Sequence, residues 1–263
     1  MVSAVLAMGR SIAPKGLRQR LRGLLRNRVY TVLLNCELQY AEDNLYTANT
    51  APFLADERFR RAYAAGEATN SWSGLSIRWR VYIACWAAER AAALPGDFIE
   101  FGVNRGGLAR SIVEYLDFNK TGKKFLLVDT FSGLVTRYLS DTERARGLEN
   151  IYAYYKSNSI LEVRRTFAAF RTVELVEGVV PDILPQIEVD TIAYATLDMN
   201  CTLPEIRAAE FLWDRLVCGG VLLLDDYGQK LHSEQQVAFD AFATARGVSV
   251  LCLPTGQGLI LKP

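Results

Sequence analysis

The chain has 263 residues, half of them hydrophobic, and its 30 Lys and Arg nearly balance its 29 Asp and Glu. This composition is typical of one globular unit with a small appendage, and it excludes disordered, collagen-like and coiled-coil chains. A formal net charge of +1 gives no global field for nucleic acid, so no nucleic-acid partner is expected. No hydrophobic run approaches the roughly 18–20 residues of a membrane-spanning helix.

The five cysteines predict packed thiols in a reducing compartment. Their number is odd and no C-x-x-C pair occurs, which disfavours a disulfide framework and a thiolate zinc site. At the N-terminus a short apolar stretch precedes the basic residues, the reverse of a secretory signal. We therefore expect a cytoplasmic protein.

The near-neutral sum of charges hides an uneven distribution. Residues 1–36 hold seven basic residues and no acidic one, which leaves 23 basic and 29 acidic residues in the rest of the chain. Leucines recur at helical spacing between the arginines of residues 16–36, which predicts a basic amphipathic helix. This helix could contact an anionic membrane or a partner subunit, or it could be a solvated docking helix. A homo-oligomer is also expected.

The first clear element after the unpatterned residues 37–75 is a helix over residues 76–94. Ser76 is its candidate N-cap, and the Pro95-Gly96 pair marks its end. Residues 1–95 are therefore predicted to be a helical N-terminal extension of a domain that covers residues 96–263.

In that domain short hydrophobic runs alternate with helical patterns. The runs are 98–103, 124–129, 173–178, 191–198, 220–226, 248–254 and 258–262, and the helical patterns include 107–116, 160–170 and 204–216. This alternation predicts an α/β fold with a doubly wound, mostly parallel seven-stranded sheet. The short turn at residues 255–257 predicts an antiparallel last strand. The charged, Tyr-rich residues 135–160 are predicted to be a lid-like insertion.

A glycine-rich turn, residues 100–107 with the pattern E-x-G-x-x-x-G-G, follows the first run. Ligands of open α/β sheets bind at the carboxyl ends of the strands, where glycines let the backbone approach and a helix N-terminus favours negative charge. The dinucleotide fingerprint G-x-G-x-x-G is excluded because residue 104 is Asn. The turn could hold a ligand carboxylate, with Glu100 supporting the turn or an ammonium group, or it could be a tight turn without a ligand.

The next two runs also end at residues that could contact a ligand. Asp129 could accept the two ribose hydroxyls of a nucleoside, or it could cap the following helix. At Gly178-Val179, the end of the third run, an adenine ring could lie. Glu100, the glycine turn and Asp129 together indicate a ligand site more specifically than any one of them alone.

Three carboxylates end the fourth and fifth runs, Asp198 and the pair Asp225-Asp226. Carboxylates that converge on one sheet edge repel each other unless they are protonated or neutralised by a cation, and oxygen ligands suit Mg²⁺ better than Zn²⁺. The alternative is that they cap helices or pair with arginines. The single histidine, His232, is a candidate general base or substrate contact, or an incidental loop residue.

Five motifs combine these features: GDFIEFGVNRGG (96–107), LLVDTFSGL (126–134), VEGVVPDILP (176–185), LDMN (197–200) and CGGVLLLDDYG (218–228). In this order they resemble the macrocin-type O-methyltransferases, class I enzymes that methylate sugar hydroxyls in macrolide and aminocoumarin biosynthesis. The resemblance runs from about Arg78 to the C-terminus. It implies a class I methyltransferase fold, S-adenosylmethionine and Mg²⁺ as cofactors, and a sugar or glycoside hydroxyl as the small-molecule substrate.

The resemblance also implies roles for individual residues. The cofactor would be bound by Glu100, Gly102, Val103, Asn104, Arg105, Gly106, Asp129, Thr130, Phe131, Gly178 and Val179. The metal would be bound by Asp198, Asp225 and Asp226. The catalytic residues would be Asp198, Asn200 and His232.

At one motif the chain departs from the family pattern. The usual D-x-D-x-Y reads here Asp198-Met199-Asn200-Cys201-Thr202, so Asn200 replaces the second acid and Thr202 replaces the tyrosine. Because an amide cannot take up a proton at neutral pH, another group, first of all His232, would be the base, or the substrate differs. The departure also leaves two other hypotheses open: a non-catalytic cofactor-binding protein on the same fold, and a nucleotide-dependent oxidoreductase.

Overall fold

The computed structural model describes residues 37–157 and 160–263. By its contacts the chain divides into two units, Met1–Pro52 with Gly74–Ser76 and Phe53–Ser73 with Ile77–Pro263. In the first unit β1 (Tyr40–Glu42) and β2 (Leu45–Thr47) form an antiparallel hairpin. Its two turn residues, Asp43 and Asn44, both have positive φ, as a two-residue hairpin turn requires.

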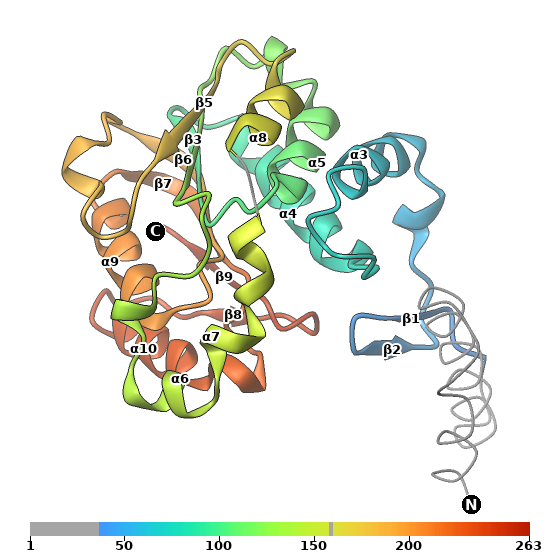
Figure 1. Cartoon of the computed structure of the whole chain (residues 1–263). Coiled ribbons are helices and arrows are strands. Elements are labelled where there is room, and N and C mark those ends of the chain that lie inside the picture. Colours follow the sequence, from blue (N-terminus) through green and yellow to red (C-terminus); the bar gives the residue numbers. More distant parts are fainter. Residues whose placement is uncertain (1–36, 158–159) are drawn as a thin grey trace, which may run out of the picture. The chain divides into compact units, whose positions relative to one another are not determined.

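The second unit is built around a twisted sheet. Within the described residues, seven strands follow the order β5-β4-β3-β6-β7-β9-β8, with β9 antiparallel to both of its neighbours and the other pairs parallel (Figure 1). The strands are β3 (Asp97–Phe101), β4 (Phe125–Asp129), β5 (Val173–Glu177), β6 (Ile192–Leu197), β7 (Leu216–Leu224), β8 (Leu251–Cys252) and β9 (Gly258–Leu261). The predicted mostly parallel sheet with an antiparallel last strand is confirmed.

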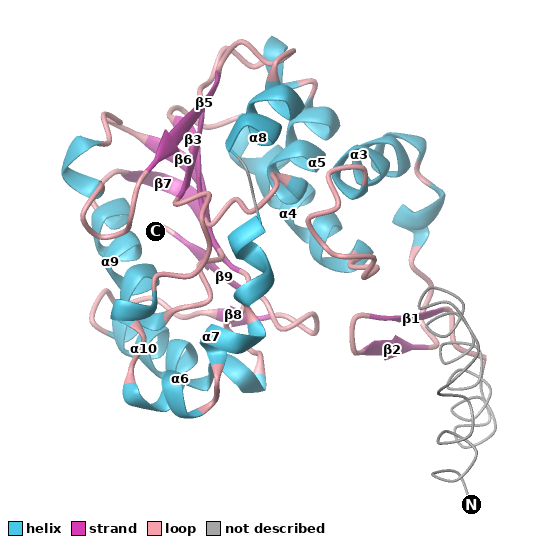
Figure 2. Ribbon diagram, in the orientation of Figure 1, coloured by secondary structure: helices cyan, strands magenta, loops and turns pink. Residues whose placement is uncertain are grey.

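Helices lie on both sides of this sheet, with α4, α5 and α8 on one side and α9 and α10 on the other (Figure 2). The longer helices are α3 (Glu57–Glu67), α4 (Arg78–Ala92), α5 (Gly107–Leu116), α8 (Ile160–Phe167), α9 (Thr202–Trp213) and α10 (Ser233–Thr244). The core between the layers is apolar and includes Ile99, Phe101, Leu197 and Leu224, which are at most 1% exposed.

Two predictions about the N-terminal part need correction. Ser76 does not cap α4: Ile77 is the N-cap residue, and the Ser76 hydroxyl donates to Glu42 Oε2 at 2.8 Å instead. The boundary between the units is not at residue 96, because α3 packs on α5 and α4 packs on α5, β6 and β7. The part before residue 96 also contains the β1–β2 hairpin, so it is not purely helical.

The amphipathic helix predicted over residues 16–36 lies outside the described residues, and its contact with a membrane or a subunit stays a prediction. The oligomeric state and the cytoplasmic location also stay predictions. In the part of the chain that the structure describes, every helix is too short or too polar to span a membrane.

The predicted insertion at residues 135–160 consists of short helices rather than an extended loop. They are η3 (Thr136–Tyr138), α6 (Asp141–Ala145), α7 (Leu148–Ile151) and η4 (Ala153–Ser157). A capping box starts α6, in which Ser140 accepts from the Glu143 N–H and Glu143 accepts from the Ser140 N–H. Leu139 and Leu148 form a small hydrophobic cluster with Cys201, which anchors this insertion beside the end of β6.

Candidate functional site

The site residues gather where the parallel strands end. Hydrogen bonds continue past the strands, from Gly102 N to Val128 O, from Gly178 N to Asp129 O, and from Asp198 N to Phe101 O. They hold the ends of β3, β4, β5 and β6 at one edge of the sheet. The strand order reverses between β3 and β6, and this switch point is where open α/β sheets bind their ligands.

A pocket opens at this edge. Its lining comprises Gly102, Asn104, Val128, Asp129, Thr130, Gly133, Leu134, Val135, Tyr155, Gly178, Val180, Asp198, Met199, Asn200, Cys201 and Pro204. Seven predicted site residues are therefore brought together: five from the cofactor set, and Asp198 and Asn200 from the catalytic set. Glu100, Val103, Arg105, Gly106, Phe131, Val179, Asp225, Asp226 and His232 are not among the lining residues.

Asp129 closes the glycine turn from the neighbouring strand. Its Oδ2 accepts from Val103 N at 2.6 Å and from Asn104 N at 2.8 Å, and its Oδ1 accepts from Phe131 N at 2.7 Å. Burial raises the pKa of Asp129, and these backbone hydrogen bonds oppose that rise. Thr130 Oγ1 also donates to Oδ1, at 3.4 Å, so of the roughly four acceptor positions of a carboxylate at most about one is open to a ligand hydroxyl in the pocket.

The N-terminus of α5 is satisfied by a residue that sequence reasoning missed. Ser71 Oγ accepts from Gly107 N at 2.8 Å, and Asn104 Nδ2 donates to Ser71 O at 3.0 Å. Gly106 N bonds to Val103 O within the turn. The start of α5 is therefore held by the segment after α3, and the N–H groups of Val103, Asn104 and Gly107 donate within the protein. The binding of a ligand carboxylate by N–H groups of the turn stays a prediction.

Glu100 lies on β3 behind the turn and is 2% exposed. Its Oε2 has no hydrogen-bond partner among the described residues. Burial raises the pKa of Glu100 well above the usual range, and the charges of Asp225 and Asp129 raise it further. A buried oxygen of this kind is suited to a cationic or N–H-bearing ligand group.

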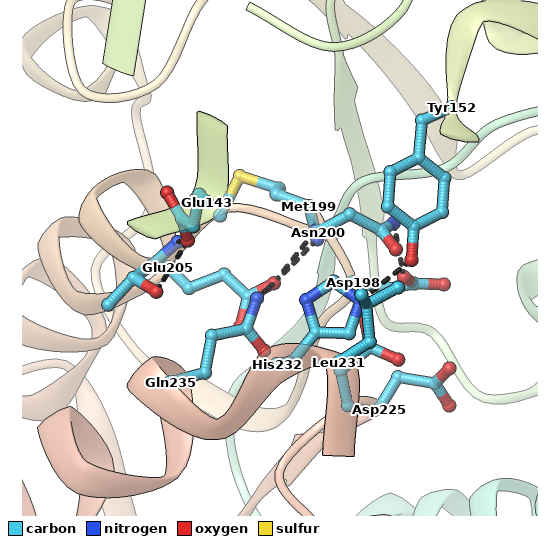
Figure 3. A network of polar contacts seen from close by, with 12 residues as sticks. Glu143, Tyr152, Asp198, Met199, Asn200, Glu205, Asp225, Leu231, His232 and Gln235 are labelled. Carbon is cyan, nitrogen blue, oxygen red and sulfur yellow. Dashed lines mark hydrogen bonds and ion pairs between the residues drawn. The ribbon is translucent and has the colours of Figure 1, made fainter. Parts of the chain in front are cut away.

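The loop after β6 carries Asp198 and Asn200 and is fixed by Glu205 of α9 (Figure 3). Glu205 Oε1 accepts from Met199 N at 2.9 Å, Asn200 N at 3.0 Å and Gln235 Nε2 at 3.2 Å. Asn200 has a positive φ of 55°, and its Nδ2 donates to Asp198 Oδ1 at 3.1 Å. Burial raises the pKa of Asp198 well above the usual range, and Asp225 and Asp226 add to the rise.

Replacing Glu205 by alanine should destabilise the protein because three N–H groups, two of them in buried hydrogen bonds, lose their acceptor. Each such loss costs about 1–3 kcal/mol, so we expect a loss of roughly 3 kcal/mol or more in the free energy of unfolding. This should lower Tm by roughly 6–10 °C in scanning calorimetry. Glu205→Gln keeps Oε1 and should stay within about 1 kcal/mol of the native chain. Equal Tm values for the two variants would contradict this role.

Thr202, which stands where the family has a tyrosine, binds the insertion. Glu143 Oε1 accepts from Thr202 N at 2.8 Å and from Thr202 Oγ1 at 2.6 Å. Glu143 is 3% exposed and belongs to α6. The departure at Thr202 therefore has a structural consequence: it ties α6 to the start of α9, next to the pocket.

The predicted metal set does not form a metal site. The described residues contain no group of three or more His, Cys, Asp or Glu side chains that could hold a metal ion. The physical reason is at Asp225, where Arg80 Nη1 lies 2.8 Å from Oδ2 and Gln257 Nε2 donates to Oδ1 at 3.0 Å. The alternative that the acids pair with arginines is the one this carboxylate follows, and the residues present do not fit a three-carboxylate Mg²⁺ site.

His232 lies behind the pocket rather than in it. It is 2% exposed, its Nε2 is 2.7 Å from the Tyr152 hydroxyl, and Asp226 Oδ2 is 3.6 Å away. Burial lowers the pKa of His232 to about 4, so the ring is neutral at pH 7. Figure 3 shows the ring beside Tyr152.

Comparison with known proteins identifies the family. The family model of the macrocin-O-methyltransferases (TylF) matches residues 46–251. Among curated proteins, the demethyldecarbamoylnovobiocin O-methyltransferase of Streptomyces niveus is 28% identical over 146 residues, which cover 51% of this chain and 53% of that protein. The match thus spans about half the length of the curated relative.

Two solved structures share the fold. The O-methyltransferase NovP has a TM-score of 0.61 at 22% identity, over 70% of this chain and 79% of that chain. The calicheamicin methyltransferase CalS11 has a TM-score of 0.56 at 16% identity, over 81% of this chain and 94% of that chain. Since the family model covers more than half of the residues, the chain belongs to the TylF macrocin-O-methyltransferase family and has the class I methyltransferase fold.

Proposed function

We propose that the protein is an S-adenosylmethionine-dependent O-methyltransferase whose acceptor is a hydroxyl of a sugar or of a glycosylated natural product. The observation that carries the proposal is one continuous pocket that joins Asp129 to Asp198 across the switch point of the sheet. Family membership supports the reaction, and the name of the Streptomyces niveus relative supports a glycosylated acceptor.

The residues of the pocket fit this cofactor. Asp129 would accept one ribose hydroxyl, and Gly102 and Asn104 line the part of the pocket next to the turn, where the amino-acid end would lie. Gly178, at the end of β5, lines the side that the sequence assigns to adenine. Glu100 lies outside the pocket lining, and its buried oxygen without a described hydrogen-bond partner would support the turn from behind or face the ammonium group of the cofactor.

The cofactor would supply a methyl group on a positively charged sulfur. The acceptor oxygen would bond to that methyl carbon as the carbon–sulfur bond gives its electron pair to sulfur, and a base of this chain would take the hydroxyl proton. Asp129 and Asp198 are the carboxylates among the described lining residues, and Asp129 is committed to the turn. Asp198 is therefore assigned as the proton acceptor, held in place by Asn200.

Two parts of the sequence prediction are not used in this scheme. Mg²⁺, which the family resemblance implies, takes no step, because the three aspartates do not form a ligand set. His232 is buried outside the pocket lining and contacts the Tyr152 hydroxyl instead.

Replacing Asp198 by alanine should abolish turnover and spare cofactor binding. With labelled S-adenosylmethionine and a panel of glycosides, we expect methyl transfer by the native chain and at least about 100-fold slower transfer by Asp198→Ala, since a positioned base contributes about 10²–10⁴-fold. The affinity for S-adenosylhomocysteine should stay within a few-fold. Asp182→Ala removes an exposed carboxylate paired with Arg137 and serves as the matched control. Unchanged transfer by Asp198→Ala would refute the assignment.

Asn200 favours a second candidate, a cofactor-binding protein without methyltransferase activity, because it replaces the acid of the family motif. Tight binding of S-adenosylhomocysteine without transfer to any hydroxyl-bearing acceptor would favour this candidate over the enzyme.

A further inference from the structure

Side chains around Asp225 donate hydrogen bonds to its carboxylate. A metal ion at this site would need the same carboxylate as a ligand. Arg80 reaches it from the first turn of α4, and both side chains of this ion pair are largely buried, 16% exposed for Arg80 and 12% for Asp225. A buried guanidinium–carboxylate pair is screened little by solvent. Arg80 therefore presents a full positive charge at the edge of the sheet where the three aspartates gather.

Gln257 fixes the other oxygen of Asp225 from the turn before β9. It is completely buried, and its own Oε1 accepts from Thr255 Oγ1 at 3.0 Å, so its amide nitrogen faces Asp225. Both oxygens of Asp225 are thus engaged by protein donors from two separate elements. A Mg²⁺ ion, which requires oxygens at about 2.0–2.1 Å in near-octahedral geometry, would have to displace these donors and approach the guanidinium charge.

Beside Asp198, too, the cluster carries less negative charge than the family motif would give it. The second acid of the family motif is the neutral Asn200, which donates to Asp198 Oδ1. Arg80 lowers the pKa of Asp198 against the larger effects of burial and the two neighbouring aspartates. One negative charge has been lost and one positive charge stands beside the cluster, so the need for a divalent cation is reduced from both sides.

We propose that Arg80 is a positioning residue that supplies the positive charge of the aspartate cluster in place of a divalent cation, so that methyl transfer by this chain needs no metal. The part about transfer rests on the proposed function, whereas the part about metal binding does not. A consequence for the substrate class follows: without a chelating metal, the acceptor needs a single hydroxyl rather than a vicinal diol.

The test is a Mn²⁺ titration followed by electron paramagnetic resonance. The amplitude of the free Mn²⁺ signal falls when the ion binds to protein. The full chain is stripped with EDTA, exchanged into metal-free buffer and titrated with S-adenosylhomocysteine present. We expect the native chain and Arg80→Lys, which keeps the charge, to leave the free signal unchanged. Arg80→Gln should take up one Mn²⁺ per chain. Arg207→Gln, which breaks an exposed ion pair with Glu210, is the control and should behave like the native chain.

Uptake of one Mn²⁺ per chain by the native protein would overturn the inference, as would the failure of folded Arg80→Gln to gain Mn²⁺. The native titration decides even if Arg80→Gln does not fold. Transfer activity gives the second readout: EDTA should change the native rate less than twofold, and a tenfold loss restored by Mg²⁺ would overturn the inference. If no methyl transfer occurs under any condition, the proposed function fails, while the Mn²⁺ titration still tests Arg80.

Discussion

Replacing Gly102 by alanine is expected to leave little folded protein. Gly102 has φ of +87°, and a Cβ built on it would lie 1.9 Å from the backbone oxygen of Asp198. Backbone atoms cannot move aside as a flexible side chain does, so β3 and β6 would have to separate at the switch point. The strained φ alone costs about 1–2 kcal/mol, and the clash should bring the loss to more than about 4 kcal/mol, a large part of the stability of a typical domain.

Gly122→Ala separates the clash from the strain. Gly122 also has a positive φ, +71°, but a Cβ there would meet nothing within 4 Å. Urea unfolding should give a loss of about 1–2 kcal/mol for Gly122→Ala and a loss at least twice as large, or no soluble protein, for Gly102→Ala. If the two variants lose the same free energy of unfolding, the claim that β3 and β6 approach too closely at Gly102 to admit a Cβ is wrong.

Replacing Asp129 by alanine is expected to weaken binding of S-adenosylhomocysteine by about 10–100-fold. A hydrogen bond to a charged acceptor contributes about 1.5–3 kcal/mol, and one ribose hydroxyl would lose such a bond, which corresponds to about 10–150-fold in affinity. The change also removes the acceptor of Val103 N and Asn104 N, so the turn beneath the cofactor loosens. Isothermal titration calorimetry measures the affinity directly.

Two variants control this experiment. Asp129→Asn keeps one acceptor oxygen and should bind with intermediate affinity. Glu174→Ala removes an exposed carboxylate of the neighbouring strand β5, paired there with Lys124, and should bind like the native chain. A native affinity in Asp129→Ala, with an unchanged Tm, would show that Asp129 does not contact the cofactor.

Much of the fold could be predicted because the relevant signals are local. Apolar runs bounded by glycines and helices predict buried parallel strands, and their ends predict where Gly102, Asp129 and Asp198 meet. β7 begins four residues before the predicted run because Leu216 pairs with Ile192 across a register shift, and β8 is shorter than its apolar run. Neither difference moves the site.

The contacts that decide the chemistry could not be predicted from the sequence because they join segments that are far apart in it. Arg80 is 145 residues from Asp225, and neither the helix pattern of α4 nor the strand pattern of β7 indicates that they pair. Ser71 lies in a stretch without periodicity, yet it holds the start of α5. The prediction of a magnesium site rested on three acids sharing a sheet edge, and it lacked the cation that the fold brings to them.

The most direct test of the central claim, a nucleoside cofactor of the methyltransferase type in the pocket at the ends of β3, β4 and β5, is calorimetric titration of the full chain with S-adenosylhomocysteine and, separately, with NAD⁺. We predict saturable binding of one S-adenosylhomocysteine per chain, weakened at least about tenfold in Asp129→Ala, and no heat with NAD⁺. Binding of NAD⁺ in preference, or no binding of S-adenosylhomocysteine to the folded native chain, would contradict the account.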